Sequence, residues 1–116
     1  MTAVLFTCAG QRVDIVSAFS RAGAFTVATD ADRLAPALYH AHRMAVAPRI
    51  DTPEYVPALA DLVREHDIRL VIPLTDLDQS LLARSRDALA PALVLVSEPD
   101  VCDAMGDKWA AHVFFE

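Results

Sequence analysis

The fold is decided close to the N-terminus, by the stretch AVLFTCAGQR at residues 3–12. Its aliphatic start, residues 3–8, has no polar alternation, which predicts a strand buried on both faces. One glycine, Gly10, marks a tight loop, and the apolar spacing after it predicts a helix over residues 12–22. This order is typical of the start of a nucleotide-type α/β domain, although a phosphate-binding loop usually carries more glycines.

Strands and helices alternate along the rest of the chain. Further strands are predicted at 25–29, 43–47, 70–74 and 92–96. Helical segments are predicted at 36–41, from Thr52 as N-cap and Pro53 at N1 to about His66, from Thr75 through Leu89, and from 97–100 to the chain end. The alternation predicts an α/β fold: a three-layer Rossmann-like domain with a parallel sheet of about five strands flanked by helices.

Composition narrows the function classes. A length of 116 residues suits one domain, and the net charge of −6 with scattered basic residues argues against a nucleic-acid partner. No apolar run approaches the roughly 18 residues of a membrane span, and the N-terminus lacks signal-peptide features, so we expect a cytoplasmic protein without a membrane partner. Cys8 and Cys102 are expected to be reduced, and neither the cysteines nor the histidines have metal-site spacing.

The candidate site follows from the parallel sheet. Loops after parallel strands lie at one edge, and ligands bind there at the point where the strand order reverses. If the first strand is central, this switch point lies between it and the strand at 70–74. The loops at 7–12 and 75–78 would then form a crevice.

The first loop allows two interpretations. Gly10 and Arg12 at a helix N-terminus could receive a carboxylate or phosphate, or Gly10 only permits the turn while Arg12 pairs with a nearby Asp. Asp30 follows Gly10 by 20 residues, as in a dinucleotide fingerprint, but one glycine is too few for a specific match. An NAD(P)-binding oxidoreductase or epimerase domain is therefore an alternative.

The fourth loop carries two acids. Asp76 and Asp78 could bind magnesium or an amine, but their i, i+2 spacing directs them differently on a helix. For Asp78 an N-cap or first-turn dipole role is the favoured interpretation. Asp76, nearer the switch point, is the better functional candidate.

The order of short motifs resembles a known family. The opening VLFTCAGQR is similar to the TSAGRR start of carbamoyl-phosphate-synthase-like and PylC-like ATP-grasp proteins. Further matches follow in the same order: ATD at 28–30, APAL at 35–38, PEY at 53–55, VIPLTD at 71–76 and MGDK at 105–108. Two departures concern the substrate: Gln11 replaces a frequent Arg, and Asp78 replaces the acid of a D-x-E pattern.

The resemblance implies the Rossmann-like pre-ATP-grasp domain of a ligase that joins a carboxylate to an amine, or makes a carbamoyl-phosphate-type product, through an acyl-phosphate. It implies ATP and Mg²⁺ as cofactors of the parent protein, with neither bound tightly by this fragment. Lys108 of the GDK motif is the implied nucleotide contact; without the resemblance, a solvated helix residue is the favoured interpretation. Gly10, Arg12, Asp30, Asp76 and Asp78 are the implied substrate-side residues, and no catalytic residue is expected in this stretch.

The expected organisation is a domain over 1–104 and the start of a linker or helix over 105–116. The apolar pattern runs uncapped to Val113, Phe114 and Phe115, so we expect a C-terminal ATP-grasp domain as partner, together with a small carboxylate or amine substrate. A stand-alone α/β interaction module is the remaining alternative, with the last helix as a homodimer interface.

Overall fold

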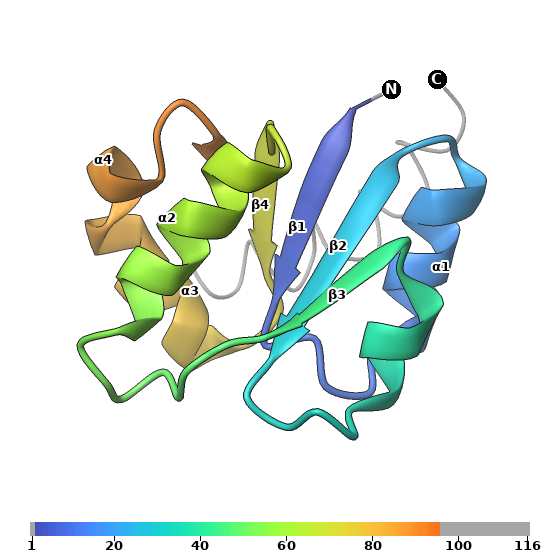
Figure 1. Cartoon of the computed structure of the whole chain (residues 1–116), viewed down its shortest axis with the longest axis horizontal. Coiled ribbons are helices and arrows are strands. Elements are labelled where there is room, and N and C mark those ends of the chain that lie inside the picture. Colours follow the sequence, from blue (N-terminus) through green and yellow to red (C-terminus); the bar gives the residue numbers. More distant parts are fainter. Residues whose placement is uncertain (1, 96–116) are drawn as a thin grey trace.

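The computed structural model describes residues 2–95 and shows one parallel sheet of five strands with helices on both faces (Figure 1). The strand order is β3-β2-β1-β4-β5, which confirms the predicted α/β class and the central place of the first strand. The strands are β1 (Ala3–Thr7), β2 (Phe25–Asp30), β3 (Arg43–Val46), β4 (Leu70–Pro73) and β5 (Leu93–Val94). The helices are α1 (Val13–Arg21), the 3-10 helix η1 (Pro36–His40), α2 (Tyr55–Glu65), α3 (Asp76–Arg84) and α4 (Arg86–Leu89).

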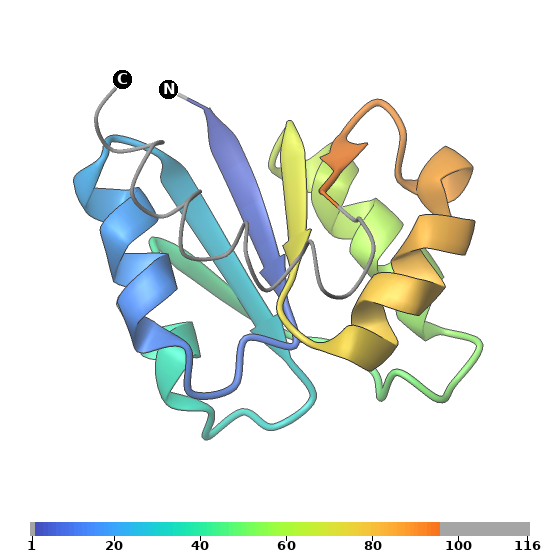
Figure 2. The ribbon, with the colours of Figure 1, turned by 180° about the vertical axis from the view of Figure 1, so that it is seen from behind.

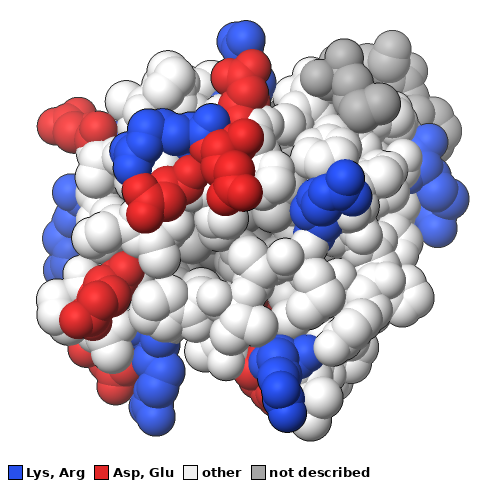
Figure 3. Space-filling view, in the orientation of Figure 1, with Lys and Arg blue, Asp and Glu red and all other residues white. Residues whose placement is uncertain are grey.

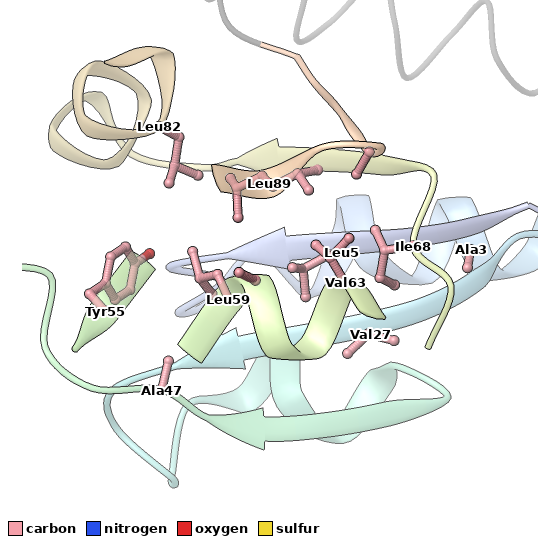
Figure 4. Close-up of a cluster of buried hydrophobic side chains, with 13 residues drawn as sticks. Ala3, Leu5, Val27, Ala47, Tyr55, Leu59, Val63, Ile68, Leu82 and Leu89 are labelled. Carbon is pink, nitrogen blue, oxygen red and sulfur yellow. The ribbon is translucent and has the colours of Figure 1, made fainter. Parts of the chain in front are cut away.

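Side chains of β1 alternate between two separate cores. Leu5 packs toward α2, α3 and α4, while Val4 and Phe6 pack toward α1 and η1. Figure 4 shows the first core, in which Leu59 and Val63 of α2 lie over the sheet. Because both faces are covered (Figures 1 and 2), all five residues of β1 are buried, as its unbroken aliphatic run predicted.

The second core is tied together by aromatic packing. Phe6 of β1 meets Phe19 of α1 edge-on, with ring centroids 5.3 Å apart and an interplanar angle of 72°. Val16 of the same helix is fully buried, and Gly23, with φ at 99°, ends the turn behind α1. The predicted stripe of apolar residues in this helix is therefore what holds it on the sheet.

The predicted start of α2 is wrong by two residues. Thr52 does not cap the helix; its hydroxyl donates to the Arg49 carbonyl at 2.7 Å, and Glu54 occupies the N-cap position. A local side-chain bond to the preceding turn competes with capping for the same hydroxyl. Pro53 accordingly lies in that turn and Tyr55 is the first helical residue.

The helix predicted from Thr75 through Leu89 is divided. The predicted start at Thr75 is correct, but the N-cap is Thr75 and not Asp78: the Thr75 hydroxyl accepts from the Asp78 N–H at 3.3 Å. The helix ends at Ser85, whose φ of −112° is not helical and whose hydroxyl donates to the Leu81 carbonyl at 3.0 Å. A serine that bonds back to the preceding turn favours such a break.

Several predictions concern residues outside the described range 2–95. They are the last helix, Cys102, the nucleotide contact Lys108 and the boundary between 104 and 105. Among residues 2–95, no helix combines the length and the apolar character needed to cross a membrane. On the face shown in Figure 3, basic side chains are scattered and partly interspersed with acidic ones rather than gathered into a patch.

Candidate functional site

The strand order places a switch point beside β1. The chain moves from β1 to β2 and β3 on one side and then returns to β4 on the other, so the loops after β1 and β4 diverge here. The Leu74 N–H donates to the Thr7 carbonyl at 3.2 Å, which keeps the two loop origins adjacent. The predicted switch point between β1 and β4 is thus confirmed.

Gly10 and Asp30 join the loops after β1 and β2. The Gly10 N–H donates to Asp30 Oδ2 at 2.8 Å, and the Asp32 N–H donates to Asp30 Oδ1 at 2.9 Å. Gly10 has φ at +51°, while an added Cβ would meet nothing closer than 3.9 Å. The glycine is therefore required by its backbone conformation and not by a close approach. The two hydrogen bonds account for Asp30 without any ligand.

Arg12 lies at the start of α1 with its side chain half-exposed. Its Nε is 3.6 Å from Asp14 Oδ1, and the Asp14 side chain is more exposed still. This is the pairing with a nearby Asp that the sequence left open. An exposed ion pair of this kind contributes little, so it leaves the guanidinium accessible to a ligand from solvent.

A buried polar network lies at the end of β1, beside the switch point. The Asp78 carboxyl, fully buried, accepts hydrogen bonds from the Thr7 hydroxyl and, at 2.7 Å, from the Tyr55 hydroxyl. The Cys8 thiol lies 3.5 Å from the Tyr55 hydroxyl. The network joins the end of β1 to the first turns of α2 and α3, and so fixes the origin of the first loop.

The network shifts the acidity of its members. Burial raises the pKa of the Asp78 carboxyl, and the hydrogen bonds from Thr7 and Tyr55 oppose that rise. Burial, followed by the nearby Asp78 charge, raises the pKa of the Tyr55 hydroxyl far above its ordinary range. Burial also raises the pKa of the Cys8 thiol, so this cysteine is a neutral thiol and not an activated nucleophile.

The two acids of α3 have opposite environments. Asp76 is exposed at the first helical position, whereas Asp78, two residues later, is fully buried. The i, i+2 spacing predicted this divergence. The sequence did not predict the burial of Asp78, because Thr7 and Tyr55 lie 71 and 23 positions away from it.

Sequence reasoning missed Thr7 and Tyr55 as members of the site. The available signals were modest: Thr7 is the one polar residue of the aliphatic strand, and Tyr55 opens the apolar stripe of α2. Of the predicted substrate-side residues, the structure brings Gly10 and Asp30 into contact. Within residues 2–95, no group of three or more His, Cys, Asp or Glu side chains is placed to hold a metal ion.

Comparison with known protein families matches residues 4–96 to one described as PylC-like, N-terminal domain. The chain belongs to the PylC-like N-terminal domain family. This confirms the resemblance drawn from the ordered motifs. A search of the curated proteins gave no match.

Two solved structures share the fold of this PylC-like domain. Glycinamide-RNase-transformylase T from Mycobacterium tuberculosis is 18% identical with a TM-score of 0.62, covering 80% of this chain and 28% of that one. A single-chain, multi-domain long-chain acyl-CoA carboxylase is 19% identical with a TM-score of 0.61, covering 93% of this chain and 12% of that one. The PylC-like domain therefore spans less than a third of either neighbour, and at these identities the likeness shows the fold alone.

Proposed function

We propose that the chain is the N-terminal, substrate-side domain of an ATP-grasp ligase that joins a carboxylate to an amine. The membership of residues 4–96 in the PylC-like N-terminal domain family is the observation that carries the proposal. In such a reaction a carboxylate oxygen takes the γ-phosphoryl group of ATP, ADP leaves, and the amine then displaces phosphate from the acyl carbon. The role of this domain is to hold and orient a substrate, not to transfer phosphate.

The geometry of the switch point supports this role. Arg12 at the start of α1 and Asp76 at the start of α3 are both exposed, on loops that follow the adjacent strands β1 and β4. A guanidinium suits a carboxylate or phosphate, and a carboxylate suits an ammonium group. Asp78 beneath them is held by Thr7 and Tyr55 and serves as a support.

ATP and Mg²⁺ belong, in this proposal, to a further domain of a longer protein. Lys108 is the residue of this chain offered to the nucleotide, because an ammonium is a compact partner for phosphate oxygens. The neighbours of similar fold are several times longer than the stretch they share with this chain, in keeping with a second domain.

The dinucleotide alternative has less support from the first loop. In that alternative the N–H groups around Gly10 receive a pyrophosphate and Asp30 receives a ribose. Here the Gly10 N–H is donated to Asp30, and both Asp30 oxygens already accept backbone hydrogen bonds. A ligand would have to displace these bonds.

The proposal is tested by comparing the 116-residue chain with a longer protein that carries the following domain. We expect ADP release only from the longer protein, and only when a carboxylate and an amine from a small-molecule panel are both present. In that protein, Asp76→Asn should raise the KM for the amine by about tenfold or more, the equivalent of one charge-assisted hydrogen bond, with a smaller effect on kcat.

Asp87→Asn is the matched control for this substitution. Asp87 is an exposed acid in the first turn of α4, away from the switch point, so its loss should leave the KM unchanged. Absence of ADP release with every pair of substrates would refute the ligase assignment. Equal KM values for the two variants would refute the role of Asp76.

A further inference from the structure

A hollow opens at the carboxyl ends of β2 and β3, beside the loop that follows β1. It has a volume of about 170 Å³, and six of the residues that line it are Cys8, Ala31, Ala47, Pro48, Ile50 and Tyr55. It lies on the side of β1 opposite to β4, and Asp30 forms part of its wall. We call it the β2–β3 cleft.

The walls of the β2–β3 cleft are mainly aliphatic. Ala31 lies in the loop after β2, and Ala47, Pro48 and Ile50 belong to the segment between β3 and α2. Ile50 packs partly on the sheet core and remains half-buried. A hollow with such walls favours apolar groups, because water inside it has few polar partners.

The two charged residues that border the cleft, Asp30 and Arg49, each have partners within the chain. Both oxygens of Asp30 accept backbone hydrogen bonds, from Gly10 and Asp32. Arg49 Nε is 3.4 Å from Asp51 Oδ1 and its Nη2 is 3.4 Å from Asp51 Oδ2. The charged atoms of Arg49 are exposed and paired with Asp51 outside the aliphatic wall, so a charged ligand would lose part of its hydration against that wall on entering.

The inner side of the cleft carries two weakly polar groups. The Cys8 thiol lies 3.5 Å from the Tyr55 hydroxyl, and that hydroxyl donates its hydrogen to Asp78. Since the Tyr55 hydrogen goes to Asp78, the Cys8 S–H is the donor in its contact with Tyr55. The sulfur is polarizable, so it is a favourable neighbour for an uncharged ring. Through Tyr55 the cleft is connected to the buried polar network at the end of β1.

We propose that the β2–β3 cleft is a binding subsite for an uncharged, mainly apolar group about the size of a six-membered ring. An enclosed apolar cavity of roughly 150 Å³ binds benzene; the β2–β3 cleft has a similar volume of about 170 Å³ and opens to solvent beside Ala31. The inference goes beyond the proposed function: it concerns the ligand chemistry of this cleft and holds whether or not the protein consumes ATP.

Three probes with one ring and different charges test it. Benzyl alcohol, benzoate and benzylamine are titrated into the full 116-residue chain at pH 7, and backbone and methyl NMR shifts are followed. We expect saturable shifts at Cys8, Ala31, Ala47 and Ile50 with benzyl alcohol. Benzoate and benzylamine should bind at least about tenfold more weakly, because each must lose charge hydration against the aliphatic wall.

Two variants locate the binding. Ala31 is exposed at the mouth, so Ala31→Trp fills the cleft without entering the core and should weaken benzyl alcohol binding by about tenfold. Ile50→Asp places a carboxylate on the wall and should reverse the preference, so that benzylamine binds more tightly than benzyl alcohol. Ala83→Trp, at an exposed site on α3, is the control and should change neither affinity.

The possible results of these titrations either support or overturn the subsite. Binding of benzyl alcohol that is lost in Ala31→Trp, kept in Ala83→Trp and changed in charge preference by Ile50→Asp supports the subsite. Equal binding of the three probes, shifts confined to other surfaces, or no saturable shift at all overturns it. None of these readouts uses ATP, so failure here is distinguishable from failure of the ligase assignment.

Discussion

The hydroxyl of Tyr55 gives the sharpest test of the buried network. Tyr55→Phe removes one oxygen and keeps the ring, which is 2% exposed in the core. The lost hydroxyl donates to Asp78 Oδ1 at 2.7 Å, and Asp78 is fully buried. Water cannot replace the missing donor there, so the carboxyl then depends mainly on the Thr7 hydroxyl.

The magnitude depends on the charge of Asp78. A hydrogen bond to an ionised acceptor contributes about 1.5–3 kcal/mol and one to a neutral acceptor about 1 kcal/mol. Because the Tyr55 bond lowers the pKa of Asp78 against the effect of burial, its removal raises that pKa further. The free energy of unfolding should therefore fall by about 1 kcal/mol while Asp78 is protonated and by about 2 kcal/mol or more once it is ionised, so the loss should be larger at pH 8 than at pH 4.

Urea unfolding followed by circular dichroism at the two pH values measures both quantities. Tyr39→Phe is the matched control: its hydroxyl also donates at 2.7 Å, to the Arg33 carbonyl, but the residue is 61% exposed. Its loss should cost less than about 0.5 kcal/mol at either pH. A loss in Tyr55→Phe no larger than in Tyr39→Phe, or a loss independent of pH, would refute the assignment of the network.

Three further predictions concern the same region. The folded-state pKa of Asp78 is raised above its ordinary 3.8, so the folded protein binds more protons than the unfolded chain. This contribution to stability is complete below pH 3.8 and is lost as the pH rises toward the folded-state pKa, with a slope of at most about 1.4 kcal/mol per pH unit. Unfolding curves of Asp78→Asn collected across pH 3–8 should lack this decline. Gly10→Ala should lower the free energy of unfolding by about 1–2 kcal/mol through its φ of +51° alone, and a loss above about 3 kcal/mol would contradict the open space around it. In a Cys102→Ser background, Cys8 should react with iodoacetamide more slowly than free cysteine at pH 7.5. Because burial raises the pKa of the Cys8 thiol, the reaction rate plotted against pH should have its midpoint above pH 9.0. A midpoint below pH 9.0 would contradict that burial.

The fold was predictable because its signals are local. The unbroken aliphatic run of β1 requires cover on both faces, and the alternation of strands and helices then leaves few topologies. The start of α2 was not predictable from Thr52 and Pro53, because the Thr52 hydroxyl has two possible backbone partners and the structure uses the Arg49 carbonyl. Capping patterns indicate that a helix begins nearby, not which residue begins it.

The candidate site was only partly predictable, since its contacts join distant positions. Gly10 and Asp30 were identified together from their spacing of 20 residues, and they are in contact. Tyr55 was identified only as one residue of an apolar stripe. Its hydroxyl matters because the register of the sheet and the position of α2 bring it to Asp78, and neither is encoded near Tyr55 itself.

The first turn of α3 gives its two acids different tasks. Asp78 anchors the helix to the end of β1 and to α2, so its oxygens are committed to Thr7 and Tyr55 and it presents no free carboxylate to a substrate. Asp76 has the same chemistry but is exposed at the edge where β1 and β4 diverge. The same helix N-terminus favours the charge of both. The departure from a D-x-E pattern at position 78 therefore concerns the residue that meets Thr7 and Tyr55. Under the proposed function, contact with an amine falls to Asp76.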